Sequence, residues 1–286
     1  MDFGKIPIDE LDSISFKLPP DTVLTKQTLI NLKPVAKPPV YIGCAKWGRK
    51  EWVGNLYPAK TKEKDFLSNY VQHFNSVELN AMHYKLYDEE TVAAWSSLAG
   101  DRDFKFCPKM VRSVTHFSTL ISPKAFEITG KFLTSVMAFG KHLGPVFIQL
   151  SDRFSPKRKE NLFTWLKTLP GDVDFFVELR HPEWFSDKTV KQETFGLLNE
   201  LGIGAVITDT AGRRDCLHMN LTIPKVFIRF VGNNLHPTDY TRVDKWIARL
   251  KKWRKDGLKE IYFFLHQPDE INTPAICDYM RKHLQL

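Results

Sequence analysis

The sequence contains little cysteine, and its cysteines form no paired motif. Four cysteines, Cys44, Cys107, Cys216 and Cys277, are spread over 286 residues without a CxxC pair. This spacing argues against a zinc ribbon or a redox dithiol and is typical of a reducing compartment. No stretch approaches the roughly 20 apolar residues of a membrane span, and the N-terminus has early acidic residues and no apolar leader. We therefore expect a cytoplasmic protein without a membrane partner.

The signature loops of several enzyme classes are also missing. The chain has no Walker loop, no GxGxxG turn, no GxSxG nucleophile elbow and no HExxH helix. The first three absences argue against nucleotide-driven and serine-hydrolase chemistry, and the missing HExxH motif argues against a metal-dependent hydrolase. An open doubly wound sheet usually has a glycine-rich phosphate turn after its first strand. Here "GCAKWG" stands at that place, which makes this fold the less favoured alternative.

The composition is that of a globular protein with a basic surface. Hydrophobic residues make up 43% of the chain and charged residues 26%, and the net charge is +8. An excess of positive charge is compatible with an anionic partner such as a phosphate, an acidic sugar or a nucleic acid. The densest basic runs, "PKRKE" (156–160) and "RLKKWRK" (249–255), fall on expected helices. Such runs are more typical of solvated helix faces than of a nucleic-acid patch.

Short apolar runs of strand length alternate with amphipathic helical segments from Tyr41 onward. The expected strands are residues 40–45, 76–80, 103–108, 146–150, 174–179, 202–208, 226–232 and 261–266. Ser122-Pro123 predicts a capped helix start, and a last helix is expected over 273–284. Only the connection 209–225 lacks helical periodicity and is expected to be a loop. The pattern predicts a (β/α)8 TIM barrel over 40–286.

The first 39 residues differ from the rest of the chain. Residues 1–39 have no sustained period and contain five prolines after Asp12. We expect this segment to form an N-terminal arm that packs outside the barrel.

Ionisable residues stand at the carboxyl ends of the expected strands. In "DFFVELR" the apolar Val177 and Leu179 suit the helix side, so Glu178 and Arg180 point into the barrel. The same alternation sends further polar side chains inward: Glu78, Asn80, Lys109, Gln149, Arg229 and His266. Asp209 directly follows the sixth strand and is expected beside them, and Cys44 and Cys107 also fall on inward positions.

These residues predict a polar ring at the barrel mouth. The carboxyl ends of the strands form the face where enzymes of this fold assemble their sites. Single pairs, such as Glu178 with Arg180 or Glu78 with Lys109, are equally compatible with structural ion pairs. A ring of eight or nine desolvated polar groups favours a ligand site, because apolar packing would stabilise a purely structural interior better.

Five segments carry a family resemblance. They are "IGCAKWGRKEWVGNLYP" (42–58), "HFNSVELNAMHY" (73–84), "FKFCPKMVRSVTH" (104–116), "VELRHPEWF" (177–185) and "FIRFVG" (227–232). Together they resemble the YecE-like proteins, whose domain has no known function. The resemblance covers about residues 40–284 and implies a barrel of the sugar-isomerase type.

The family's motif positions can be transferred onto this chain. They fall on Trp47, Glu78, Asn80, Tyr84, Lys109, His116, Gln149, Glu178, Arg180, His181, Trp184, Asp209 and Arg229. Two positions depart from many relatives. Val231 stands where a His is common, and "LHQPDE" (265–270) stands where an Asn-Asn-Asp run is common. Either His266 at the end of the eighth strand replaces an amide function of those relatives, or the substrate differs between branches of the family.

We divide the candidate residues by the chemistry of their side chains. Candidate catalytic groups are Glu78, Glu178, His181, Asp209 and His266. Candidate substrate-binding groups are Trp47, Asn80, Tyr84, Lys109, His116, Gln149, Arg180, Trp184 and Arg229. The first hypothesis is an isomerase-like enzyme without a cofactor that acts on a small phosphorylated or acidic sugar. A glutamate would then be the base, the three cations would hold the anion, and a histidine would be the acid.

Two alternatives remain open at this stage. The first is a metal-dependent phosphoester hydrolase or nuclease, with a divalent ion held by Glu78, Glu178, Asp209 and either His181 or His266. The second is a barrel that binds a small anion or a nucleic acid without catalysis.

Overall fold

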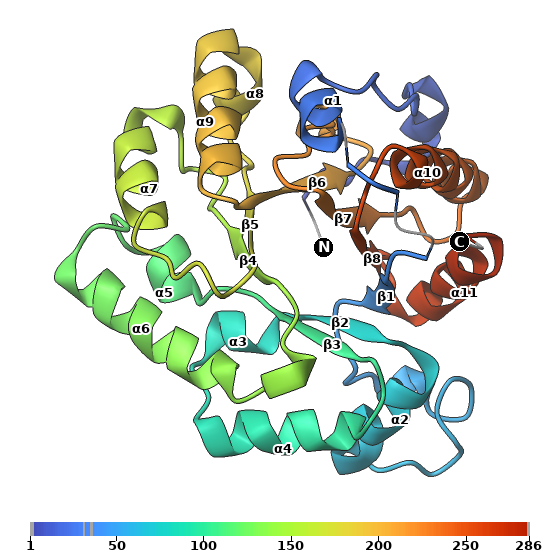
Figure 1. Ribbon diagram of the computed structural model, residues 1–286. Coiled ribbons are helices and arrows are strands. Elements are labelled where there is room, and N and C mark those ends of the chain that lie inside the picture. Colours follow the sequence, from blue (N-terminus) through green and yellow to red (C-terminus); the bar gives the residue numbers. More distant parts are fainter. Residues whose placement is uncertain (1–2, 31, 35–36, 285–286) are drawn as a thin grey trace.

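Eight parallel strands lie at the centre of the molecule and helices surround them (Figure 1). The computed structural model describes residues 3–30, 32–34 and 37–284. The strands are β1 (Val40–Cys44), β2 (Ser76–Leu79), β3 (Lys105–Pro108), β4 (Val146–Gln149), β5 (Phe175–Glu178), β6 (Gly204–Asp209), β7 (Lys225–Val231) and β8 (Glu260–His266). Each lies where the sequence predicts a strand.

The helices follow the strands in the expected alternation. They are α1 (Val23–Leu29), α2 (Phe66–His73), α3 (Ala81–Tyr84), α4 (Glu89–Ala99), α5 (Arg112–Thr115), α6 (Pro123–Met137), α7 (Lys159–Leu166), α8 (Glu183–Ser186), α9 (Lys188–Glu200), α10 (Pro237–Lys255) and α11 (Thr273–His283). The 3-10 turns are η1 (Ile8–Ser13), η2 (Lys50–Trp52), η3 (Glu63–Asp65), η4 (Gly140–His142), η5 (Pro156–Arg158), η6 (Arg214–Cys216) and η7 (Glu270–Asn272).

Helix starts and connections also agree with the sequence. The Ser122 side chain caps α6 by accepting a hydrogen bond from the N–H of Ala125, and Pro123 occupies the first turn. Between β6 and β7 the described chain contains only the 3-10 turn η6, which confirms the expected loop. Among the described residues, no helix is both long enough and apolar enough to cross a membrane.

The strand order makes a nearly closed barrel. Neighbours run β3-β2-β1-β8-β7-β6-β5-β4, all in parallel. The two end strands meet through isolated bridges, one of which pairs Lys109 with Phe147. The N–H of Met110 donates to the carbonyl of Phe147 at 3.0 Å across this seam. The predicted (β/α)8 barrel is confirmed.

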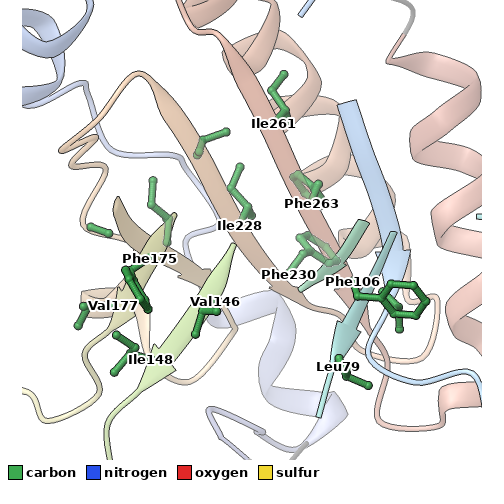
Figure 2. Packing of buried hydrophobic residues seen from close by; sticks show 14 of the residues in the cluster. Leu79, Phe106, Val146, Ile148, Phe175, Val177, Ile228, Phe230, Ile261 and Phe263 are labelled. Carbon is green, nitrogen blue, oxygen red and sulfur yellow. The ribbon is translucent and has the colours of Figure 1, made fainter. Parts of the chain in front are cut away.

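Side chains alternate between the two faces of the barrel wall. Outward residues such as Val177, Ile228 and Phe263 belong to the large apolar cluster that the strands form with the helices (Figure 2). A separate apolar cluster fills the interior: Tyr41, Cys107, Phe147, Phe176, Val206, Phe227, Tyr262 and Phe264. This cluster forms an apolar floor beneath the polar side chains at the strand ends, as expected for a barrel of this type.

The prediction that Cys44 points into the barrel is wrong. Its Sγ lies 3.8 Å from the Sγ of Cys277 on α11, within the outer cluster. The reason is the parity of β1. Tyr41 faces the interior cluster, so Cys44, three residues later, falls on the opposite face. Burial raises the pKa of both Cys44 and Cys107 well above the usual thiol value, so both are neutral core residues.

The arm contacts the barrel through α1 and the residues before it. Asp21 accepts from Arg249 at 2.8 Å and from the indole N–H of Trp253 at 2.9 Å, both on α10. Thr25 donates to the carbonyl of Met219 at 2.6 Å in the loop before β7. The basic run 249–255, expected on a solvated face, therefore also binds the arm through Arg249 and Lys252.

Candidate functional site

A cavity of about 700 Å³ opens at the carboxyl ends of the strands. Ten of the candidate residues line it: Trp47, Glu78, Asn80, Tyr84, Lys109, His116, Gln149, Arg180, Arg229 and His266. A second hollow of about 540 Å³ lies near the amino ends of β1 and β3 and is lined by Phe74, Asn75 and Arg102, among others. Enzymes of this fold place their sites at the first of these two faces.

Arg229 on β7 is the centre of the polar layer. Its Nε and Nη2 donate to the two oxygens of Glu78, each at 2.8 Å. Its Nη1 donates to both oxygens of Glu178, at 3.0 and 2.8 Å. All three side chains are at most 1% exposed. One planar guanidinium therefore joins strands β2, β5 and β7 in a doubly charge-assisted network.

The two glutamates remain ionised despite their burial. Burial alone would raise the pKa of Glu178, but Arg180 and Arg229 outweigh it and lower the pKa to about 2. Burial opposes ionisation of Glu78 as well, and Arg229 with His266 holds its pKa well below the usual range. Both carboxylates are weak proton acceptors at neutral pH. They position other groups better than they abstract protons.

Lys109 follows β3 directly and ends in the cavity. Its Nζ donates to the side-chain oxygen of Gln149 at 2.7 Å, and the Gln149 Nε2 donates to Glu178 at 2.7 Å. Burial lowers the pKa of Lys109 to about 7, with Arg229 and Arg180 adding repulsion and Glu178 opposing it. A neutral amide thus separates this amine from the nearest carboxylate.

Three histidines surround the cavity. The His266 Nε2 lies 3.0 Å from Glu78, and since a carboxylate only accepts, this nitrogen carries the proton. His83 and His116 contact each other with ring centroids 4.9 Å apart. Burial and Lys109 lower the pKa of His83 to about 3 and that of His116 to about 4. Both rings are therefore neutral at physiological pH.

Asp209 does not join the ring, which corrects the prediction. Thr208 faces inward and donates to Glu178 at 3.1 Å, so Asp209 points outward to α10. There it accepts from Arg242 at 2.9 Å and from Trp246 at 2.7 Å, and it pairs with Arg214. Burial would raise the pKa of Asp209, but the two arginines lower it.

Trp184 and His181 also lie outside the cavity. Trp184 on α8 is fully buried, stacks on Phe154 and donates its indole N–H to the Phe154 carbonyl at 2.7 Å. The His181 Nδ1 accepts from the N–H of Glu183 at 3.3 Å. The residues after β5 turn away into α8, so the inward alternation ends at Arg180.

The cavity also contains polar residues that were not among the candidates. These are His83 on α3, Lys46 after β1 and Glu270 on η7. Strand alternation predicts the direction of side chains on strands only, so it gives no information on residues in loops and short helices. The histidine in "NAMHY" was visible in the sequence, but nothing local distinguishes it from a half-exposed loop residue.

The arm reaches the site as well. The Phe3 ring lies 4.1 Å from the guanidinium carbon of Arg180 and 5.1 Å from that of Arg213. Thr210, which follows β6, donates to the carbonyl oxygens of Phe3 and Gly4. A segment remote in sequence therefore packs on one of the cations that line the cavity.

The metal-site hypothesis finds little geometric support. Over residues 3–30, 32–34 and 37–284, no group of three or more His, Cys, Asp or Glu side chains has metal-binding geometry. The oxygens of Glu78 and Glu178 already accept from Arg229, and Asp209 faces away.

Curated relatives are similar to this chain in sequence. The UPF0759 protein YecE of Escherichia coli strain K12 is 29% identical over 264 residues, which covers 86% of this chain and 93% of YecE. The UPF0759 protein YunF of Bacillus subtilis strain 168 is 29% identical over 159 residues, covering 54% of this chain and 55% of YunF.

Solved structures share the fold. A DUF72 family protein from Thermotoga maritima MSB8 has a TM-score of 0.67 at 23% identity, covering 87% of this chain and all of its own. Another from Enterococcus faecalis V583 has a TM-score of 0.67 at 17% identity, covering 87% and 99%. The family profile "Protein of unknown function DUF72" matches residues 41–286, so the chain belongs to the DUF72 family, which includes the YecE-like proteins.

Proposed function

We propose that this protein is an enzyme that acts by acid and base chemistry on a small anionic hydroxy-carbonyl compound, such as a sugar phosphate or a sugar acid. The observation that carries the proposal is the charge of the cavity. Arg180 and Arg229 pair with the carboxylates of Glu178 and Glu78, and Arg180 also lies 3.7 Å from Asp152. The side-chain hydrogen-bond partner of Lys109 is the neutral amide of Gln149, so a bound anion would stabilise the charged form of this lysine.

The geometry favours His266 over the glutamates as the base. Glu78 accepts a hydrogen bond from Nε2 of His266 at 3.0 Å, which leaves Nδ1 as the ring nitrogen that could accept a proton from the substrate. The same carboxylate would stabilise the imidazolium that forms when the ring takes a proton. The sequence-based assignment gave the base role to Glu78 or Glu178, but the arginines hold both in their weakly basic form.

The substrate anion would bind to the cations at the cavity rim. Arg180 and Lys46 both line the cavity. Arg180 donates to Glu178 at 3.0 Å and lies 3.7 Å from Asp152, so a substrate anion would join an ion-pair network that already holds this side chain in place. A guanidinium can hold a phosphate or carboxylate through two parallel hydrogen bonds. Arg229 is fully buried and donates to both glutamates, so its role is to fix their positions and to maintain the positive potential.

Thermal unfolding with a panel of ligands tests this function. Wild type and Arg180→Ala would be heated with sugar phosphates, sugar acids, nucleotides and oligonucleotides, each with and without a divalent metal ion. A ligand at about 100 times its dissociation constant adds roughly 2.7 kcal/mol to the free energy of unfolding. We expect one class of small anion to stabilise wild type and not Arg180→Ala.

Arg102→Ala is the matched control. Arg102 is an exposed arginine that lines the hollow at the opposite end of the barrel. It should respond to ligands as wild type does. Equal stabilisation of wild type and Arg180→Ala, or no stabilisation by any small anion, would contradict the proposal. A ligand that binds and is never turned over would point to a barrel that binds without catalysis.

One observation favours nucleic acid as a second candidate partner. Tyr84 and Phe117 are 64% and 74% exposed near the cavity mouth, and the Arg112 guanidinium lies 5.2 and 5.7 Å from their ring centroids. Exposed aromatic rings beside an arginine can stack on bases. An oligonucleotide affinity that falls steeply with salt and is weakened by Phe117→Ala would support this candidate.

A further inference from the structure

The side-chain amine of Lys109 combines three properties that the acid and base mechanism does not use. It lies at the carboxyl end of β3, lines the cavity and is only 7% exposed. Burial of a lysine amine away from any cavity would lower the stability of the fold, because the charged form would lose its hydration. Here the amine borders open volume, so a bound molecule can reach it.

The surroundings of the amine favour its neutral form when no anion is bound. No carboxylate of the described chain lies within salt-bridge distance of Nζ, and its hydrogen-bond partner is the neutral amide of Gln149. Arg180 and Arg229 line the same cavity and repel a positive charge at this position. Desolvation next to other cationic groups is the condition that makes a lysine amine nucleophilic.

Gln149 has a defined part in this arrangement. Its oxygen accepts from Lys109 at 2.7 Å, while its nitrogen donates to Glu178 at 2.7 Å. The amide therefore orients the amine without supplying a compensating charge. A glutamate at this position would pair with the lysine and favour the ammonium form.

We propose that Lys109 is a covalent catalyst that forms an imine with the carbonyl carbon of the substrate, an inference that rests on the proposed function. The amine lone pair forms a C–N bond while the carbonyl π electrons move to oxygen, which takes up a proton as the nitrogen loses one. The resulting carbinolamine loses its hydroxyl group together with the remaining nitrogen proton as water. The net reaction of amine and carbonyl to imine and water needs no oxidant or further reactant.

The imine would make the substrate reactive toward the base His266. Once protonated, it withdraws electrons from the neighbouring carbon, so His266 can remove a proton there. The substrate class narrows accordingly to small aldehydes or ketones that carry a phosphate or carboxylate for Arg180. Chemistry that rearranges or cleaves bonds next to the carbonyl fits this site.

Borohydride trapping tests the inference. The full-length protein would be incubated with dihydroxyacetone phosphate, glyceraldehyde 3-phosphate or pyruvate, reduced with sodium borohydride, and analysed by intact mass and peptide mapping. We expect an irreversible mass increase equal to the probe less one oxygen atom, located on Lys109 and absent in Lys109→Arg. Labelling should increase as the pH rises through about 7.

Two controls make the result specific. Lys105→Arg removes the lysine at the opposite end of the same strand, whose Nζ donates to the carbonyl of Lys141 at 2.7 Å, and it should leave labelling unchanged. Glycerol 3-phosphate, which lacks a carbonyl, should bind without forming an adduct. Circular dichroism would show that Lys109→Arg is folded.

The failures of the two proposals are distinguishable. A carbonyl probe that raises the thermal stability of wild type but leaves no adduct on Lys109 would overturn the covalent role and retain the proposed function. Labelling confined to other lysines would likewise overturn the covalent role of Lys109 and retain the proposed function. If no probe shifts the thermal stability or labels the protein, both proposals are overturned.

Discussion

Two buried carboxylate clusters lie at the same end of the barrel, on opposite faces of its wall. The inner cluster consists of Glu78, Glu178 and Arg229 and borders the cavity. The outer cluster consists of Asp209, Arg242 and Trp246 and lies between the wall and α10. Both contain ionised carboxylates that arginines stabilise against burial. A network of buried carboxylates and arginines is therefore not enough to distinguish a ligand-binding site from a structural ion pair.

The difference between the clusters lies in what covers them. Phe16 of the arm covers the outer cluster, with its ring centroid 4.9 Å from the Arg242 guanidinium and 5.3 Å from that of Arg214. The inner cluster is adjacent to open volume and to Lys109, a lysine without a carboxylate partner among the described residues. Open space beside such a lysine is what we expect of a ligand site.

Arg229→Met should produce the largest effect on stability. It leaves two buried carboxylates without their cation, so we expect a loss of at least about 5 kcal/mol in the free energy of unfolding at pH 7, measured by urea denaturation. Without Arg229, burial raises the pKa of both glutamates. The loss should therefore shrink as the pH falls toward 4 and the carboxylates take up protons.

Arg229→Lys is the control for this change. It keeps the charge but loses the planar fork, and it should fall between wild type and Arg229→Met. A loss that does not depend on pH would contradict the assignment of ionised Glu78 and Glu178.

Asp209→Asn should affect stability but not the site. Removal of the carboxylate leaves Arg242 and Arg214 facing a neutral amide, and we expect a loss of about 3 kcal/mol. Because this cluster faces α10, ligand affinity measured by calorimetry should remain that of wild type. Affinity that falls more than threefold would remove the functional distinction between the two clusters.

Lys109→Met should stabilise the folded protein below neutral pH, whereas the substitutions at Arg229 and Asp209 should destabilise it. In the folded protein the pKa of Lys109 is lowered to about 7 from 10.5, so the folded state binds fewer protons than the unfolded state between these values. The contribution of Lys109 to stability therefore rises with pH from about 7 to 10.5, and the cost of the buried ammonium is complete below 7.

The Lys109→Met variant lacks the pH dependence of stability that arises from Lys109. We expect it to be more stable than wild type by about 2 kcal/mol at pH 6, with the difference disappearing by pH 10, while binding of the anionic ligand is lost. Denaturation curves at several pH values would show this. A variant less stable than wild type at pH 6 would indicate that Lys109 has a structural role.

Phe3→Ala should have the smallest effect. The ring packs on Arg180 at 4.1 Å, a contact worth about 0.5 to 1 kcal/mol. We expect ligand affinity to fall about two- to fivefold because Arg180 becomes less well positioned, with little change in global stability. Phe16→Ala, which removes the corresponding ring from the outer cluster, should lower stability and leave affinity unchanged.

Local periodicity alone determined the barrel and most of its inward side chains. Strand side chains alternate with a period of two, so Val177 and Leu179 by themselves place Glu178 and Arg180 on the other face. The same local rule placed Glu78, Lys109, Gln149, Arg229 and His266 correctly, because each lies on a strand or directly after one.

Only the tertiary structure decided which of these groups meet and what they can do. Arg229 contacts Glu78 across 151 positions of sequence, and no local pattern contains that pair. Asp209 was misplaced because the sixth strand is apolar on both faces, so its parity cannot be read from its residues. The lowered pKa of Lys109 and the approach of Phe3 to Arg180 likewise depend on distances between remote segments, which folding alone establishes.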